Sequence, residues 1–180
     1  HEVAHQEFAW FIRTNAKVID IFKKIYKTQE LVTSFDGCCY YPKNSKLSNG
    51  CWTHTDISPK LAKEMNCIQG FVSLTDNKNN SLLVYEGSNN EHNKYFKDKN
   101  MENEKNNWQK IDIDFIKNID EKKKILNVSS GSVVLWDSRK FHQNIIQNMN
   151  EERLVQYVCY LPKNNKNNTE SMKMKRLKYF

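Results

Sequence analysis

Apolar positions recur at helical spacing in the first part of the chain and alternate with polar positions further on. From about Glu2 to Lys27 they fall three and four residues apart, which predicts two helices, and Asn15 is placed to cap the second. We expect these helices to pack on the outer face of a sheet. Their apolar stripes are Phe8, Phe11 and Ile12, then Val18, Ile21, Phe22 and Ile25.

Short runs rich in β-branched and aromatic residues follow and predict a mainly β domain with flanking helices. The Asn- and Lys-rich stretch 89–107 is expected to be a loop with a helical piece around His92–Phe96, and Trp108–Ile119 is expected to be an amphipathic helix. We expect one domain over 1–162, with helical support at about 2–27 and strands from about 31. The expected strands are Leu31–Tyr41, Trp52–Asp56, Ile68–Thr75, Leu82–Tyr85, Lys124–Val128, Ser132–Trp136, Phe141–Ile146 and Leu154–Leu161.

Length and composition agree with this picture. The 180 residues suffice for one domain with a two-layer core, and no apolar run reaches the roughly 18 residues needed to span a bilayer. Five cysteines without a Cys-x-x-Cys pair do not form a disulfide framework, so reduced thiols and a cytoplasmic location are expected.

The net charge of +7 is concentrated at the C-terminus. Residues 163–180 contain six basic residues and one acidic residue, Glu170, and so carry five of the seven charges. We expect a solvated basic tail, because charge runs usually form exposed ends. Binding of nucleic acid or another acidic partner is the less favoured alternative, since no motif that reads nucleic acid accompanies the charge.

The segment His54-Thr55-Asp56 carries the clearest chemistry. Side chains alternate on a strand, so His54 and Asp56 are predicted to share a face, although such a short motif also occurs by chance in surface turns. Together with His142 they would make a two-His-one-carboxylate triad, which leaves three positions open and suits non-haem Fe(II) and oxygen.

Arg153 is the second candidate of this kind. It opens an alternating strand that follows the predicted strand of His142. We expect the two strands to form an antiparallel pair that places the guanidinium one layer behind the metal. There its planar fork would bind a carboxylate through two hydrogen bonds.

These residues resemble the phytanoyl-CoA dioxygenase branch of the Fe(II)/2-oxoglutarate-dependent oxygenases. The resemblance runs from about Leu31 to Pro162. It implies a double-stranded β-helix, a jelly-roll barrel of two antiparallel sheets. It is carried by Ser34-Phe-Asp-Gly37, Trp52-Thr-His-Thr-Asp56, Gln69-Gly70, Leu82-Leu-Val-Tyr-Glu-Gly-Ser88, Leu135-Trp-Asp-Ser-Arg139 with His142, and Arg153 with Tyr157-Val-Cys-Tyr-Leu-Pro162.

The resemblance also implies an activity. His54, Asp56 and His142 would bind Fe(II), Arg153 would bind the distal carboxylate of 2-oxoglutarate, and oxygen would be consumed with release of succinate and CO2. Hydroxylation is the favoured outcome, because relatives that halogenate lack a carboxylate at the position of Asp56. The family's Pro-Gly-Ser-His element is replaced here by 86–89, so the resemblance implies the metal site but does not specify the substrate.

Other residues have two interpretations each. Gln69 would bind the cosubstrate or a substrate, or else be a satisfied buried amide. Tyr40, Trp52 and Trp136 are candidates for the pocket wall, with Tyr40 assigned to the cosubstrate, Trp52 to the substrate and Trp136 more readily to the core.

Two further candidates, Ser138 and Arg139, lie ahead of His142. They would face an anionic substrate at the pocket rim, or Arg139 would pair with Asp137. The remaining histidines lack carboxylates at ligand spacing and are expected at the surface. They are His1, His5 and His92.

Two other functions remain open at this point. A zinc hydrolase could use the same three ligands and a water molecule, but it would have no need of Arg153. A non-catalytic domain of this fold could serve as a binding or scaffold module. The substrate, a small molecule or a side chain, and the oligomeric state are not specified by the sequence.

Overall fold

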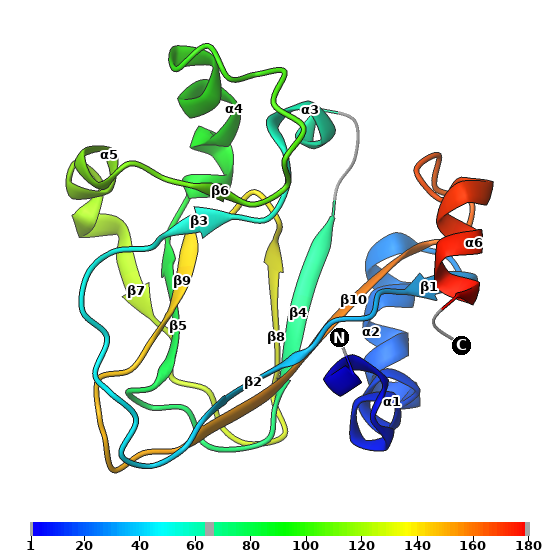
Figure 1. Cartoon of the computed structure of the whole chain (residues 1–180), viewed down its shortest axis with the longest axis horizontal. Coiled ribbons are helices and arrows are strands. Elements are labelled where there is room, and N and C mark those ends of the chain that lie inside the picture. Colours follow the sequence, from blue (N-terminus) through cyan, green and yellow to red (C-terminus); the bar gives the residue numbers. More distant parts are fainter. Residues whose placement is uncertain (1, 64–66, 179–180) are drawn as a thin grey trace.

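Two antiparallel sheets face each other in the computed structural model, which describes residues 2–63 and 67–178 (Figure 1). The first sheet has the order β1 (Leu31–Thr33), β10 (Arg153–Pro162), β4 (Ile68–Ser73) and β8 (Val133–Asp137), with β2 (Cys38–Tyr41) also paired to β10. The second has the order β6 (Gln109–Lys110), β3 (His54–Thr55), β9 (His142–Ile145), β5 (Ser81–Tyr85) and β7 (Lys123–Ile125). The expected mainly β, jelly-roll class is confirmed, but the described strands form two separate sheets rather than a closed barrel.

The space between the sheets is filled by inward-facing side chains of both layers. Phe71, Trp136 and Val155 come from the first sheet and pack with Leu82 of the second. Because alternate residues of a strand face opposite sides, the other face of the first sheet needs its own cover.

That cover comes from the N-terminal helices α1 (Glu7–Arg13) and α2 (Ala16–Tyr26), which follow the short turn η1 (Glu2–His5). Val18 and Phe22 pack against Val158 and Tyr160 of β10, as expected for helices on the outer face of a sheet. The predicted cap is confirmed, since the side chain of Asn15 accepts a hydrogen bond from a backbone N–H of the first turn at 3.0 Å.

The stripe predicted for the first helix is wrong in part. Phe8 and Phe11 are 41% and 70% exposed, and Ala9 and Arg13 are buried instead. Arg13 turns inward because its guanidinium donates hydrogen bonds to the carbonyl oxygens of Ala4 and Asp36, which keeps its charge solvated by backbone dipoles.

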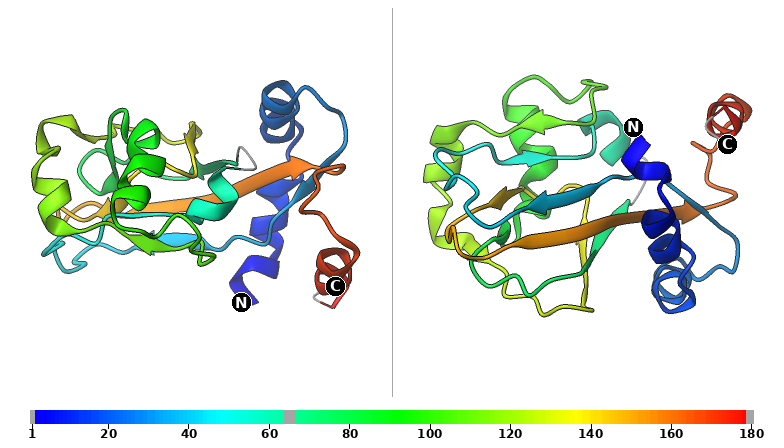
Figure 2. Two further views of the ribbon diagram at one scale, coloured as in Figure 1. Left: turned by 90° about the horizontal axis from the view of Figure 1, so that it is seen from above. Right: turned by 60° about the horizontal axis from the view of Figure 1, so that its bottom comes forward.

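The middle of the chain forms short helices over the second sheet: α3 (Pro59–Ala62), α4 (Ser88–Asp98), α5 (Ile113–Lys117) and the turn η2 (Asp120–Lys122). The helix expected over Trp108–Ile119 is shorter than predicted, because its first residues pair with β3 as strand β6. The tail contains one more helix, α6 (Glu170–Leu177), beside the far end of β10 (Figures 1 and 2). No helix in the described part of the chain is long and apolar enough to cross a membrane.

The surface position expected for His92 is wrong, because this residue of α4 is fully buried. Its ring packs against Phe96 and Phe141, and its Nε2 lies 3.3 Å from the carbonyl oxygen of Ile57. Burial lowers the pKa of His92, so the ring is neutral and structural. His5 is partly buried against Phe35, whereas His1 lies outside the described residues.

Candidate functional site

His54, Asp56 and His142 converge on one point of the second sheet. His54 and His142 stand directly opposite each other in the β3–β9 pair, and their rings lie 4.5 Å apart between centroids. The Nε2 atoms of His54 and His142 lie 3.4 and 3.2 Å from the two carboxylate oxygens of Asp56. One ligand atom from each residue falls within 4.8 Å of the others, a spacing that a single metal ion can bridge.

Backbone groups orient all three ligands. Nδ1 of His142 lies 2.8 Å from the carbonyl oxygen of Lys140, and Nδ1 of His54 lies 3.3 Å from that of Trp52. With the proton assigned to Nδ1 in each ring, the Nε2 lone pair faces the shared point, which is the usual arrangement of metal-binding histidines. The backbone N–H of Asp56 donates to the carbonyl oxygen of Ser138 at 3.1 Å, so the β8–β9 turn fixes the carboxylate.

Electrostatics favour an ionised Asp56. Burial would raise the pKa of its carboxyl group, but in the metal-free protein the interaction with the His142 and His54 rings, when these carry a proton at Nε2, outweighs burial and holds the pKa well below its usual range. The group is therefore an anion at neutral pH, as a metal ligand must be.

The expected pairing of the His142 and Arg153 strands is wrong. β9 lies between β3 and β5 in the second sheet, whereas β10 lies in the first sheet between β4 and the strands β1 and β2. Both edges of β9 and both edges of β10 are occupied by other strands, so the two strands do not pair. The chain crosses from one sheet to the other between Ile145 and Arg153. Arg153 therefore approaches from the facing sheet.

Arg153 is fully buried, yet its guanidinium is largely unpaired. Its Nη1 lies 3.1 Å from the sulfur of Cys39, and the group packs over the rings of Tyr41 and Phe71 at 5.9 and 5.4 Å. Its Nε and Nη2 atoms have no hydrogen-bond partner among the described residues. A buried cation with two free donors is costly unless an anion meets it, so the residue fits a carboxylate ligand.

A cavity of about 390 Å³ opens beside the triad. Three further buried polar atoms without a partner in the described structure belong to residues that line it: Gln69 Oε1, Trp136 Nε1 and Asn144 Oδ1. Tyr157 also lines the cavity and lies on β10 near the guanidinium of Arg153. Burial raises the pKa of Tyr157 to about 12, against the opposing influence of the nearby guanidinium. Because buried polar groups in folded proteins are nearly always paired, these atoms indicate that a polar ligand belongs here.

The structure separates the remaining candidates. Gln69, Trp52 and Trp136 line the cavity. Tyr40 does not, because its side chain points out from β2 and is 54% exposed.

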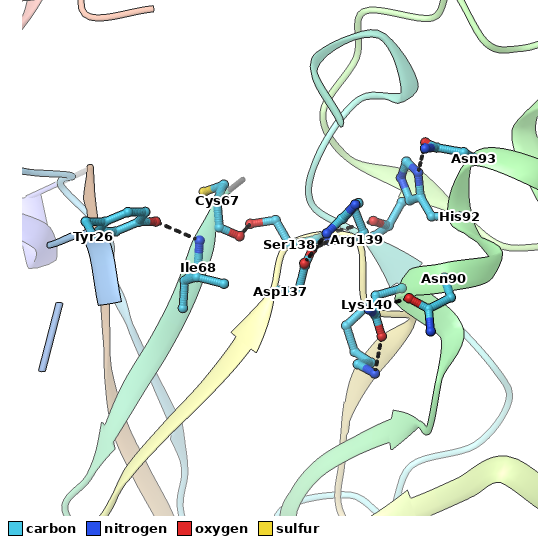
Figure 3. Close-up of polar contacts among 12 residues, drawn as sticks. Tyr26, Cys67, Ile68, Asn90, His92, Asn93, Asp137, Ser138, Arg139 and Lys140 are labelled. Atoms are coloured by element: carbon cyan, nitrogen blue, oxygen red, sulfur yellow. Dashed lines mark hydrogen bonds and ion pairs between the residues drawn. The ribbon is translucent and has the colours of Figure 1, made fainter. Parts of the chain in front are cut away.

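Ser138 and Arg139 lie in the β8–β9 turn (Figure 3). Neither residue lines the cavity. The Ser138 hydroxyl donates to the carbonyl oxygen of Cys67 at 2.9 Å. Arg139 forms a two-point ion pair with Asp137 at 2.9 and 2.6 Å. Of the two interpretations of Arg139, the structure thus has the pairing with Asp137 and not a position at the pocket rim. Both residues thus stabilise the turn that holds Asp56.

Asn144, Trp108 and Asp36 are among the cavity residues that were not singled out from the sequence. Asn144 lies two positions after His142, so the alternation of β9 could have revealed it. Trp108 stacks on the ring of His54 at 5.3 Å between centroids. The two residues are far apart in the chain, and no local pattern predicts this contact. Asp36 lies within a matched motif, but nothing in its local pattern marked it as a cavity residue.

Comparison with known proteins found two relatives. "Ava biosynthesis cluster protein O" of Aspergillus versicolor is 30% identical over 174 residues, which cover 89% of this chain and 56% of that protein. A Dictyostelium discoideum protein, provisionally named a phytanoyl-CoA dioxygenase, is 24% identical over 83% of this chain and 52% of its own length. The chain thus spans about half the length of both relatives. No family model matches it.

Among solved structures, the fold is similar to that of HygX from Streptomyces hygroscopicus with iron bound. The TM-score is 0.63 at 14% identity, over 89% of this chain and 70% of that chain. HygX has also been solved with nickel, 2-oxoglutarate and hygromycin B bound. At this identity the likeness supports the arrangement of the two sheets.

Proposed function

The chain resembles the phytanoyl-CoA dioxygenase-like branch of the Fe(II)/2-oxoglutarate oxygenases in sequence and in fold, and from this premise we propose that it is an Fe(II)- and 2-oxoglutarate-dependent dioxygenase that hydroxylates its substrate. One observation carries the proposal: the ligand atoms of His54, Asp56 and His142 converge within 4.8 Å. Two histidines and one carboxylate suit Fe(II) and leave three positions open.

The fit to 2-oxoglutarate rests on Arg153. Its two free donors, Nε and Nη2, are buried and can pair with both oxygens of the distal carboxylate. Gln69 and Asn144 offer further polar atoms to the rest of the molecule. The copies of HygX solved with iron and with 2-oxoglutarate support the same pairing of metal and cosubstrate.

Fe(II) and 2-oxoglutarate, when bound, supply the oxidising chemistry, with release of succinate and CO2. The chain supplies geometry and a dry site. His54 and His142 are nearly buried, and their Nδ1–H groups hold the rings against backbone carbonyls. Asp56 keeps a negative ligand in place, and this carboxylate favours hydroxylation over halogenation. Trp136 lines the cavity and packs at a tilt against His142, with 5.4 Å between ring centroids.

The test is turnover of 2-oxoglutarate by the purified protein. We expect succinate to form with Fe(II) and ascorbate present, and not with Zn(II) alone, which separates the oxygenase from a zinc hydrolase. Succinate that accumulates without Fe(II), or no 2-oxoglutarate binding to protein loaded with Ni(II), would contradict the proposal. A screen of candidate substrates for products heavier by one oxygen atom then addresses hydroxylation.

A further inference from the structure

The cavity beside the triad differs in charge from the rest of the protein. Lys and Arg make up 28 of the 180 residues, yet none of the described residues that line the cavity is a Lys or an Arg. Its charged and ionisable groups include two carboxylates, Asp36 and Asp56, and the two triad histidines. Apart from its buried end near Arg153, where we propose that 2-oxoglutarate binds, such a cavity offers no lining Arg or Lys to phosphates and other anions.

Asp36 is a carboxylate that the proposed chemistry does not use. Burial raises its pKa, and Asp56 across the cavity adds to this effect, whereas Ser34 opposes it by donating a hydroxyl hydrogen bond. Arg13 donates to backbone carbonyl oxygens and stabilises the carboxylate only through space. A desolvated carboxylate in this position is best compensated by a cation that enters the cavity.

Two tryptophans at the cavity offer exposed aromatic faces. Trp52 and Trp108 both stack on the ring of His54, at 4.9 and 5.3 Å between centroids. They remain 36% and 47% exposed, so part of each side chain is accessible to a ligand at the cavity. Aromatic faces attract cations, and Trp does so most strongly.

From this charge and this geometry, we propose that the substrate carries a positively charged nitrogen, an ammonium or guanidinium group, that Asp36 pairs with and that Trp52 and Trp108 contact. The inference rests on the proposed function, because it assigns the substrate class of the same cavity. Arg139, the one arginine expected to face an anionic substrate, is already paired with Asp137 outside the cavity. Acyl-CoA, whose phosphates need basic partners, is therefore not the substrate class that this cavity fits.

The test compares small ligands that differ in charge but hardly in shape. The pairs are choline with 3,3-dimethylbutan-1-ol, 1,5-diaminopentane with pentane-1,5-diol, and arginine amide with citrulline amide. Binding is measured by tryptophan fluorescence and calorimetry on protein loaded with Ni(II) and 2-oxoglutarate. In at least one pair the cation should bind tenfold or more tightly than its neutral partner, and coenzyme A should bind more weakly than that cation.

Variants locate the effect. Asp36→Asn should reduce the preference for the cation to less than threefold, and Trp108→Leu should weaken binding of the cation more than that of its partner. Asp76→Asn changes the net charge equally at an exposed position and should keep the full preference. The same samples are titrated with Ni(II) and 2-oxoglutarate alone, so a failure of the oxygenase site is seen separately.

The proposal is overturned if no cation of the three pairs binds more tightly than its neutral partner, or if coenzyme A binds best. It is also overturned if Asp36→Asn keeps the preference while binding Ni(II) as the unaltered protein does.

Discussion

We expect Arg153 to lower the stability of the ligand-free protein and to raise the stability of the complex with 2-oxoglutarate. In the ligand-free protein, two buried N–H groups of its guanidinium lack partners among the described residues. Replacing buried ion pairs with well-packed apolar side chains of similar volume is neutral or gains on the order of 1–4 kcal/mol, and a buried charge without a partner anion has even less to lose. Arg153→Met should therefore raise the melting temperature of the ligand-free protein, by about 2–4 °C for each kcal/mol at this chain length.

The same substitution should weaken 2-oxoglutarate binding. Loss of a buried two-point contact with a carboxylate costs on the order of 2–4 kcal/mol, which corresponds to a dissociation constant higher by roughly 30- to 1,000-fold. At a 2-oxoglutarate concentration of about 100 times the original dissociation constant, the unaltered protein gains about 2.7 kcal/mol of stability. The variant should gain less than about 1 kcal/mol.

Calorimetric titration and thermal unfolding, both with Ni(II) present, measure the two effects. Arg153→Lys should restore binding only in part, because an ammonium cannot reproduce the planar fork. Arg176→Met, in the tail helix, is the control and should change neither quantity. If Arg153→Met binds 2-oxoglutarate with unaltered affinity, another residue is the anchor and the argument from unpaired donors fails. Metal binding should be retained, because Arg153 belongs to the facing sheet.

Three further predictions concern separate parts of the chain. His142→Ala should abolish the thermal stabilisation by Ni(II) and lower the metal content measured by mass spectrometry, whereas His5→Ala should bind metal normally. Asp36→Asn should raise the free energy of unfolding at neutral pH. Burial raises the pKa of Asp36, so the folded state binds the proton more tightly than the unfolded state does. The unaltered protein therefore loses stability as the pH rises through that raised pKa, whereas Asn has no proton to lose. The gain should vanish in acid unfolding curves below about pH 4, where the unfolded carboxyl is protonated too. Deleting residues 163–180 should leave 2-oxoglutarate turnover within about twofold, since surface changes typically cost under about 0.5 kcal/mol; salt-sensitive nucleic-acid binding lost with the tail would instead assign the tail a partner.

The sequence was most informative where function depends on local geometry. The placement of His54 and Asp56 on one face follows from the alternation of a strand, and the cap at Asn15 follows from side-chain chemistry. Both can be inferred from a few neighbouring residues. The convergence of His54 and Asp56 with His142 is different, because it needs a register between distant strands, and the resemblance to a known family supplied what spacing alone could not.

The sequence did not reveal features that depend on which of the two sheets a strand joins. Adjacent strands in the chain were expected to pair, but β9 and β10 belong to opposite sheets, since a two-layer fold often sends consecutive strands across the core. Tyr40 faces outward because its neighbours Cys39 and Tyr41 lie toward Arg153. The pKa of Asp36 is raised mainly by burial, with smaller influences from Ser34, Arg13 and Asp56, and burial together with the last two depends on segments that are distant in sequence.

The direct opposition of His54 and His142 makes metal loading a check on correct strand pairing. A slip of β3 by one residue would turn His54 to the other face of the sheet and leave His142 without its partner. A chain paired in that way could fold into similar layers but could not hold the metal with three ligands. Metal bound during folding would therefore select the correct register, and the short two-residue strand β3, which has few backbone contacts of its own, would gain most from this selection.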